Sequence, residues 1–97
     1  MVVWTAPALA DLKDIHDYIA KDSRFYAKKV VQEMREKAEQ ADQHPMTGKM
    51  VPEVGDENIR EFHLYSYRII YEIKNNDNKE VLAVAHKRQD FKAEDLL

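Results

Sequence analysis

The glycines and prolines of the chain are concentrated in one segment, and this divides the sequence into two parts of different character. Residues 45–58 contain both glycines and two of the three prolines of the 97 residues. These two residue types interrupt helices and strands more strongly than any others. Apolar residues before this segment recur at helical spacing, whereas the stretch after it is dense in β-branched and aromatic residues. We therefore expect helices first, then a loop over 45–58, then strands.

The part before the loop predicts one short strand and two helices. Residues 2–5 form a β-rich run, and Thr5 and Pro7 are suited to the start of a helix. Two helical stripes follow, which consist of Ala8, Leu12, Ile15 and Ile19 and then of Ala27, Val30, Met34, Ala38 and Ala41. The first helix is predicted over about 6–20. The second is capped by Asp22 or Ser23 and ends at His44-Pro45. Because only a few residues separate them, the two helices form an antiparallel hairpin.

The part after the loop predicts a three-strand antiparallel meander. Strands are expected over 59–65, 67–73 and 80–86, with a tight turn at Ser66 and a second turn over 75–78. Within the loop, Met50-Val51 is expected to be a short extended piece, and residues 88–97 form a polar tail with a last helical turn. The sequence thus predicts one α+β domain over 1–97, in which the helix hairpin covers one face of the sheet and the N-terminal strand pairs within that sheet.

Composition excludes several kinds of site. There is no cysteine, so disulfides and thiolate metal sites are impossible, and the four histidines lack metal-ligand spacing. We expect no cofactor. The net charge of −3 is spread over both halves, with 7 basic and 8 acidic side chains in residues 1–48 and 8 and 10 in residues 49–97. This balance argues mildly against nucleic acid as the main ligand. No apolar run has the ~18–20 residues of a membrane span, and the N-terminus lacks a signal-peptide layout, so we expect a cytoplasmic protein with no membrane partner.

The order of these elements, with the turns and loops that separate them, resembles the RelE/ParE toxin superfamily over nearly the whole chain. Four stretches carry the resemblance: Trp4-Thr5 with Ala8 and Asp11-Leu12; Pro45 with Gly48-Lys49 and Val51-Pro52-Glu53; Arg60-Glu61 followed by Tyr67–Tyr71; and Val84–Phe91. The resemblance implies a toxin of a type II toxin–antitoxin pair that causes growth arrest and plasmid stabilization. It also implies a cognate antitoxin that wraps around the toxin, with a helix across the helix hairpin and an extended piece along the sheet.

Two activities are known in this superfamily, and the shared fold does not choose between them. ParE-like members inhibit DNA gyrase without established nuclease activity, whereas RelE-like members enter the ribosome and cleave mRNA without a metal. An RNA-cutting site needs a base, an acid and cations for the phosphate. The resemblance offers these groups as Lys49, Glu53, Arg68, His86 and Arg88. Arg68 also has a purely structural interpretation, as a salt bridge to Glu61 or Glu72 across the sheet.

Two departures from the nuclease pattern favour the ParE branch. The nuclease branch has a tyrosine near the C-terminus, but no tyrosine follows Tyr71 here and the tail offers only Phe91. In addition, Lys49 is the only cation between Lys37 and Arg60, in a span that also holds Asp42, Glu53, Asp56 and Glu57. These acids oppose a phosphate clamp. The leading hypothesis is therefore a non-enzymatic gyrase inhibitor, the alternative is a ribosome-dependent endoribonuclease, and a third is a module that binds a partner and poisons nothing. The candidate partner-binding residues are Arg60, Arg68, Tyr71, Arg88 and Phe91.

Overall fold

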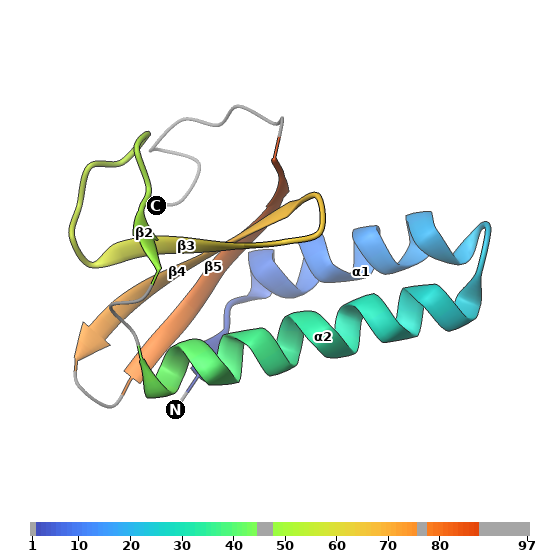
Figure 1. Cartoon of the computed structure of the whole chain (residues 1–97), viewed down its shortest axis with the longest axis horizontal. Coiled ribbons are helices and arrows are strands. Elements are labelled where there is room, and N and C mark those ends of the chain that lie inside the picture. Colours follow the sequence, from blue (N-terminus) through green and yellow to red (C-terminus); the bar gives the residue numbers. More distant parts are fainter. Residues whose placement is uncertain (1, 45–47, 76–77, 88–97) are drawn as a thin grey trace.

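The computed structural model describes residues 2–44, 48–75 and 78–87 and shows an α+β fold (Figure 1). In chain order its elements are β1 (Val2–Trp4), α1 (Ala6–Ala20), α2 (Arg24–Gln43), β2 (Lys49–Met50), β3 (Ile59–Leu64), β4 (Tyr67–Asn75) and β5 (Asn78–His86). The two helices form the predicted antiparallel hairpin and cover one face of the sheet, which confirms the fold class. The tail over 88–97, for which a helical turn was predicted, lies outside the described residues.

The strands form one five-stranded sheet in the order β1-β5-β4-β3-β2. β3, β4 and β5 are the predicted antiparallel meander, and β1 lies parallel to β5 at one edge, with Val3 opposite Glu80. The extended piece expected at Met50-Val51 is β2, which lies one residue earlier and pairs antiparallel with β3. The meander strands also extend closer to their turn than predicted, to Asn75 and from Asn78.

Side-chain caps fix where both helices begin. The Thr5 Oγ1 accepts a hydrogen bond from the Ala8 amide at 3.3 Å, and Pro7 lies in the first turn of α1, where its missing N–H is not needed. The Ser23 Oγ accepts one from the Tyr26 amide at 3.2 Å, so Ser23 rather than Asp22 caps α2. α2 ends at Gln43, two residues before Pro45, as the sequence predicted.

The main core lies between the helix hairpin and the sheet. Its buried members are Ala8 and Leu12 of α1, Val30, Met34 and Ala38 of α2, and Ile69, Val81 and Val84 of the sheet. Both predicted helical stripes thus face the sheet. An ion pair of 3.1 Å between the Lys79 Nζ of β5 and the Asp42 Oδ1 of α2 joins the two layers near the end of α2.

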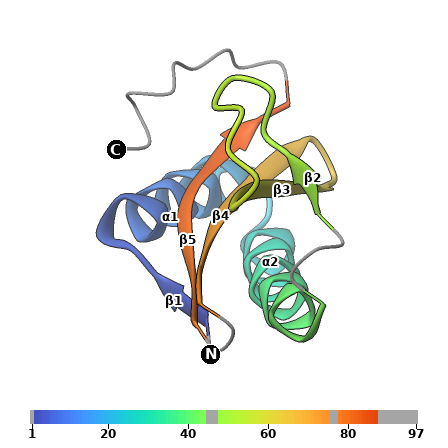
Figure 2. The ribbon, with the colours of Figure 1, turned by 90° about the vertical axis from the view of Figure 1, so that its left-hand side faces the viewer.

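A second, smaller core lies on the opposite face of the sheet. It consists of Val51, Ile59 and Ile70, with Val54, Leu82 and Ala83 packed against it. The loop between β2 and β3 folds over this face, away from α2 (Figure 2). Backbone hydrogen bonds from Val51 to the Ile59 carbonyl (3.2 Å) and from Gly55 to the Val51 carbonyl (3.0 Å) hold the loop in place. The helices therefore cover one face of the sheet, and an ordered loop partly covers the other.

Candidate functional site

Arg68 lies at the centre of an ionic cluster on the face of the sheet opposite the helices. Its neighbours Tyr67 and Ile69 belong to the helix-side core, so the alternation along β4 directs Arg68 to the other face. The Arg68 side chain is almost completely buried, with only 7% of the residue exposed. A guanidinium this deep in a protein requires anionic partners, because desolvation of an unpaired charge is costly.

Two glutamates supply those partners. The Arg68 Nη1 and Nη2 donate to the two carboxylate oxygens of Glu53 at 2.7 and 2.9 Å, which is a bidentate pair. The Arg68 Nε donates to the Glu61 Oε2 at 3.1 Å, and Nη2 contacts the same oxygen. The other oxygen of Glu61, which is 5% exposed, lies 2.7 Å from the His63 Nε2. Glu53, Glu61, His63 and Arg68 are called the Arg68 cluster below.

The electrostatics of this cluster oppose acid–base chemistry. Hydrogen bonds from Arg68 hold the pKa of Glu53 below its ordinary value, and the hydrogen bonds to Glu53 and then Glu61 raise the pKa of Arg68. A general base works best when its pKa is near the working pH. The pKa of Glu53 is lowered, away from the working pH, so Glu53 is a weaker base than a free glutamate.

The structure decides between the two salt bridges predicted for Arg68. Glu61 is its partner across β3 and β4, whereas Glu72 pairs with Lys74 at 3.1 Å. The bidentate partner Glu53 was not foreseen as an ion-pair partner. It lies 15 residues away in the loop after β2, and no local spacing rule connects that loop to the start of β4.

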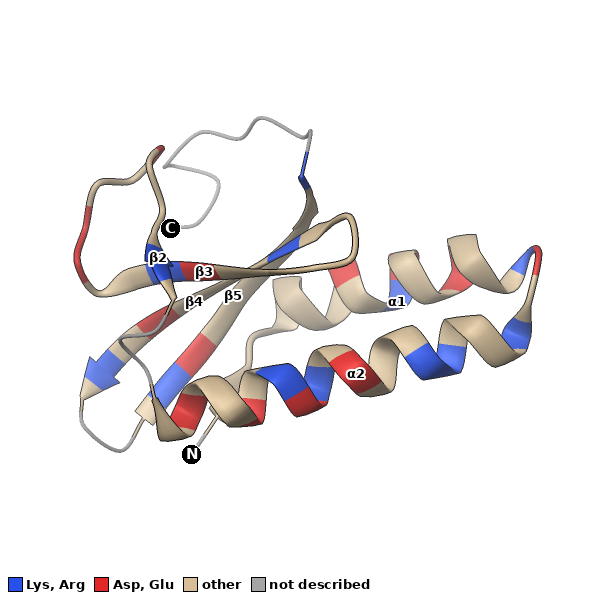
Figure 3. Cartoon of the chain, viewed as in Figure 1, with Lys and Arg blue, Asp and Glu red and all other residues tan. Residues whose placement is uncertain are grey.

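Basic residues are present on β2 and β3 (blue in Figure 3), and they have different environments. Lys49 of β2 lies opposite Glu61 in the sheet, so it is on the same face as Arg68, and it is exposed. Arg60 donates from Nε to the Glu57 carbonyl and from Nη1 to the Gly48 carbonyl, both at 2.9 Å. Arg60 thus connects the residue before β2 with the end of the loop that leads into β3, which is a structural role.

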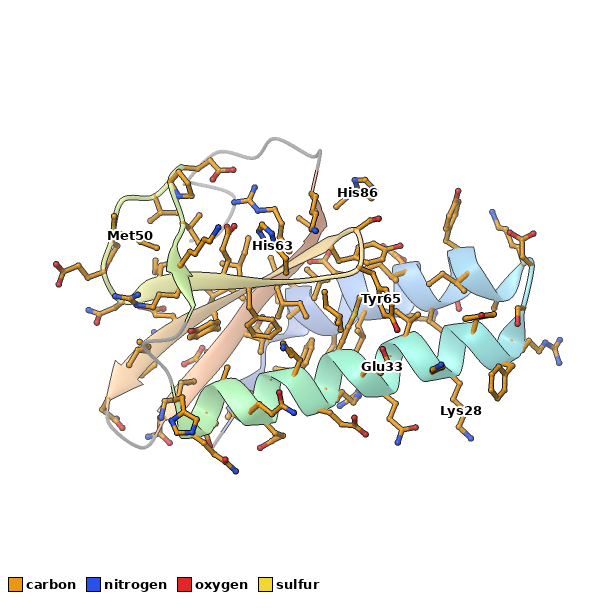
Figure 4. All side chains as sticks on the ribbon, in the orientation of Figure 1. Lys28, Glu33, Met50, His63, Tyr65 and His86 are labelled. Carbon is orange, nitrogen blue, oxygen red and sulfur yellow. The ribbon has the colours of Figure 1, made fainter. Side chains whose placement is uncertain are left out.

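His86 lies away from the cluster, on the helix side of the sheet. It is opposite Tyr67 at the end of β5, and the two rings meet edge to face at 5.8 Å. It lines an open groove of about 430 Å³ with Asp14, Tyr18 and Tyr65 (His86 and Tyr65 are labelled in Figure 4). The fold therefore brings Lys49, Glu53 and Arg68 to one face and puts His86 on the other.

Comparison with known proteins agrees with this architecture. The family model described as the ParE toxin of the type II toxin–antitoxin system parDE matches residues 2–91. The chain belongs to the ParE toxin family. It is thus a type II toxin–antitoxin toxin of the RelE/ParE superfamily, as the sequence motifs indicated.

Two solved structures share the fold of this ParE-family chain. One is the chromosomal ParDE toxin–antitoxin system of P. aeruginosa, with 24% identity, a TM-score of 0.71, and coverage of 88% of this chain and 92% of that one. The other is the toxin–antitoxin complex RelBE2 of Mycobacterium tuberculosis, with 20% identity, a TM-score of 0.63, and coverage of 89% and 95%. No curated protein matches the chain.

Of the remaining candidate partner contacts of this ParE-family chain, the structure describes only Tyr71. Tyr71, proposed from the sequence as a partner contact, is 2% exposed and packs against Phe62 at 5.9 Å between ring centres. The structure places it in the core, because its strand position faces the end of α2. Arg88 and Phe91 lie outside the described residues.

Sequence reasoning also missed a partly buried polar contact between α1 and β5. Asp11 of α1 accepts a hydrogen bond from the Val84 amide at 3.0 Å and so binds the backbone of β5 beyond the end of β1. Burial raises the pKa of Asp11. The only sequence signal was its place in the motif with Leu12. Within residues 2–44, 48–75 and 78–87, no three histidine or acidic side chains gather as a metal site, and no described helix has the length and apolarity to cross a membrane.

Proposed function

We propose that this toxin arrests growth by inhibiting DNA gyrase, cleaves no nucleic acid itself, and is neutralised by a cognate antitoxin. One observation carries the choice of target: two of the nuclease candidates, Glu53 and Arg68, form an ion pair with each other, and Glu61 is the second partner of Arg68. The match to the ParE family model supports the same branch.

The geometry of the cluster explains why it is poorly suited to RNA cleavage. A phosphate-binding arginine must present its N–H donors to the ligand. The Nε, Nη1 and Nη2 of Arg68 all donate to Glu53 or Glu61. An incoming phosphate would have to displace Glu53 and would lie beside the buried negative charge of Glu61. His86, the candidate proton shuttle, is on the opposite face of the sheet and does not face the same ligand.

A cognate antitoxin is the expected protein partner. Both similar solved structures are described as toxin–antitoxin systems or complexes. Co-expression of the small DNA-binding protein encoded beside this gene should restore growth to cells that make the toxin. If no such neighbour exists, or if it leaves growth arrested, the antitoxin proposal is contradicted.

Two assays on one preparation test the target. Purified toxin should inhibit supercoiling by DNA gyrase in a dose-dependent way, while mRNA on ribosomes incubated with the same preparation stays intact. In cells without antitoxin, division should stop and DNA damage signalling should begin while translation continues at first. Rapid cutting of ribosome-bound mRNA, with normal supercoiling, would show that the gyrase proposal is wrong.

The RelE-like endoribonuclease is the second candidate, and one observation favours it. Lys49, Glu53 and Arg68 share one face of the sheet, so a ligand that opened the Glu53–Arg68 ion pair would meet all three. Cleaved mRNA in the ribosome assay would support this candidate. If expression causes no growth arrest at all, the chain is a partner-binding module without toxicity.

A further inference from the structure

The end of the helix hairpin differs in charge from the rest of the molecule. We define the hairpin tip as residues 18–29, which include the end of α1, the turn and the start of α2. The tip has one acidic residue, Asp22, and four basic residues, which are Lys21, Arg24, Lys28 and Lys29. Its net charge of +3 stands against −3 for the whole chain. Because acidic residues elsewhere offset these cations, neither half of the sequence has a net positive charge.

Three aromatic side chains are exposed among these cations. The exposed fractions of Tyr18, Phe25 and Tyr26 are 68, 74 and 59%. The Lys21 Nζ lies 5.8 Å from the centre of the Tyr18 ring, and the rings of Phe25 and Tyr26 meet edge to face at 6.1 Å. Exposed rings are typical of binding surfaces, because aromatic residues are enriched at interfaces. A ligand that covers such rings gains the free energy of burying apolar surface.

The tip presents these groups on a projecting surface. The helix hairpin extends beyond the edge of the sheet (Figures 1 and 3). Phe25, Lys28 and Lys29 are spaced i, i+3 and i+4 on α2, so they are neighbours on its outer face, while Ala27 and Val30 are buried on the inner face. The outer face therefore combines a ring and two ammonium groups within one helical turn.

The charges of the tip are available to a ligand. All four basic side chains are exposed, and within the described part of the chain none of them forms an ion pair with a carboxylate. The nearby carboxylate of Glu33 is engaged by the hydroxyl of Tyr65, which reaches from the β3–β4 turn toward α2 (Figure 4).

We propose that the hairpin tip binds single-stranded nucleic acid. Exposed bases would stack on Phe25, Tyr26 and Tyr18, and the basic side chains would neutralise the adjacent phosphates, which is the chemistry common to sequence-tolerant single-strand binders. Exposed rings beside cations suit this ligand better than an acidic protein segment, because bases stack on the rings while phosphates pair with the cations. The inference is independent of the proposed function, since the tip belongs to the helix hairpin and the Arg68 cluster lies on the face of the sheet opposite the helices.

Fluorescence anisotropy tests the proposal with the purified chain and a labelled oligothymidylate of about twenty nucleotides. We expect saturable binding whose affinity falls with salt, with a log–log slope of about −2 to −3 for three or four phosphate contacts. Polyglutamate of matched charge should compete weakly, because it supplies anions without bases. The absence of saturable binding at low salt would refute the proposal.

Variants separate stacking from charge. Phe25→Ala should weaken binding about tenfold with little change in the salt slope. The double variant Lys28→Gln/Lys29→Gln should weaken binding and reduce the slope by about 1.4, as expected for two lost phosphate contacts. The matched control Lys13→Gln/Lys37→Gln removes two exposed lysines outside the tip and should bind like the parent chain.

Two further outcomes would overturn the proposal. If the control double variant weakens binding as much as the tip double variant, the attraction is general rather than local to the tip. If polyglutamate competes as well as the oligonucleotide and Phe25→Ala has no effect, the tip is a surface for an acidic protein. Circular dichroism of each variant verifies that the helices are retained.

Discussion

At the residue scale, the buried ion pairs of Arg68 predict that this residue stabilises the fold. In the Arg68→Ala variant, the carboxylate of Glu61 would remain buried without its cation, so we expect a loss of about 3–5 kcal/mol in the free energy of unfolding. Urea denaturation followed by circular dichroism measures this loss. The control Arg35→Ala removes an exposed guanidinium that lies 5.7 Å from the Trp4 ring and should cost only about 0.5–1 kcal/mol. Equal losses in the two variants would contradict the structural role of Arg68.

A toxicity test of Arg68→Ala must take this loss of stability into account. Loss of toxicity in Arg68→Ala does not by itself indicate a nuclease, because an unstable toxin also fails to act. Glu53 is a better probe. Its side chain is 26% exposed, and Glu61 still neutralises Arg68 when Glu53 is replaced by glutamine.

Glycine is required at position 48 because the backbone there lies close to Tyr71 and to β3, and not because of an unusual backbone angle. A Cβ at this position would collide with the hydroxyl of Tyr71 and lie 2.9 Å from the Glu61 carbonyl oxygen, which belongs to the backbone of β3 and cannot move aside. We expect Gly48→Ala to cost about 1–3 kcal/mol of stability, measured by urea denaturation.

Gly55 provides the control for this prediction. Its φ of +72° needs a residue that tolerates left-handed geometry, and nothing lies within 4 Å of a Cβ there. Asparagine tolerates that geometry, so Gly55→Asn should be nearly neutral. If Gly48→Ala is equally neutral, the close packing against Tyr71 is not what requires glycine.

At the element scale, Thr5 joins the start of α1 to the sheet. Its Oγ1 accepts from the Ala8 amide and donates to the Val81 carbonyl at 2.8 Å, whereas Ser23 caps α2 through the Tyr26 amide. Loss of a cap costs about 1 kcal/mol, so Ser23→Ala should lose about that much and Thr5→Ala up to about 2 kcal/mol. Thermal or urea unfolding compares them, and Thr5→Ser should recover most of the loss. A Thr5→Ala variant no less stable than Ser23→Ala would contradict the added role of the Val81 contact.

The elements of this chain were largely predictable, and the contacts between them were not. Both helices and the meander were located from the helical spacing of apolar residues, the capping residues, and the glycines and prolines of the loop. These signals act within a few residues. By contrast, the Glu53–Arg68 pair and the Asp11–Val84 contact join positions that are 15 and 73 residues apart. Such pairs depend on how the layers pack, and one sequence contains no direct signal for that. The charge of the hairpin tip was present in the sequence but was hidden by averaging over halves.

At the scale of the whole molecule, the sheet separates His86 from Glu53 and Arg68, three of the groups that the sequence offered for an acid–base mechanism. Glu53 and Arg68 lie on the loop-covered face, and His86 lies on the helix side next to Tyr67. Glu53 and His86 therefore do not face the same bound ligand. This separation supports the proposal that the toxin acts by binding rather than by acid–base catalysis.

This separation leads to a test of the proposed function in cells. The double variant Glu53→Gln/His86→Gln removes one candidate base and one candidate proton shuttle, on opposite faces, without leaving Arg68 unpaired. We expect it to arrest growth as the parent chain does, because gyrase inhibition needs no proton transfer by these groups. Growth curves after induction without antitoxin measure the effect, with protein level and helix content checked alongside. A double variant that is folded and abundant but harmless would mean that one of these side chains is needed for toxicity. The single variants would then identify the residue, and the ribosome assay would show whether its role is RNA cleavage.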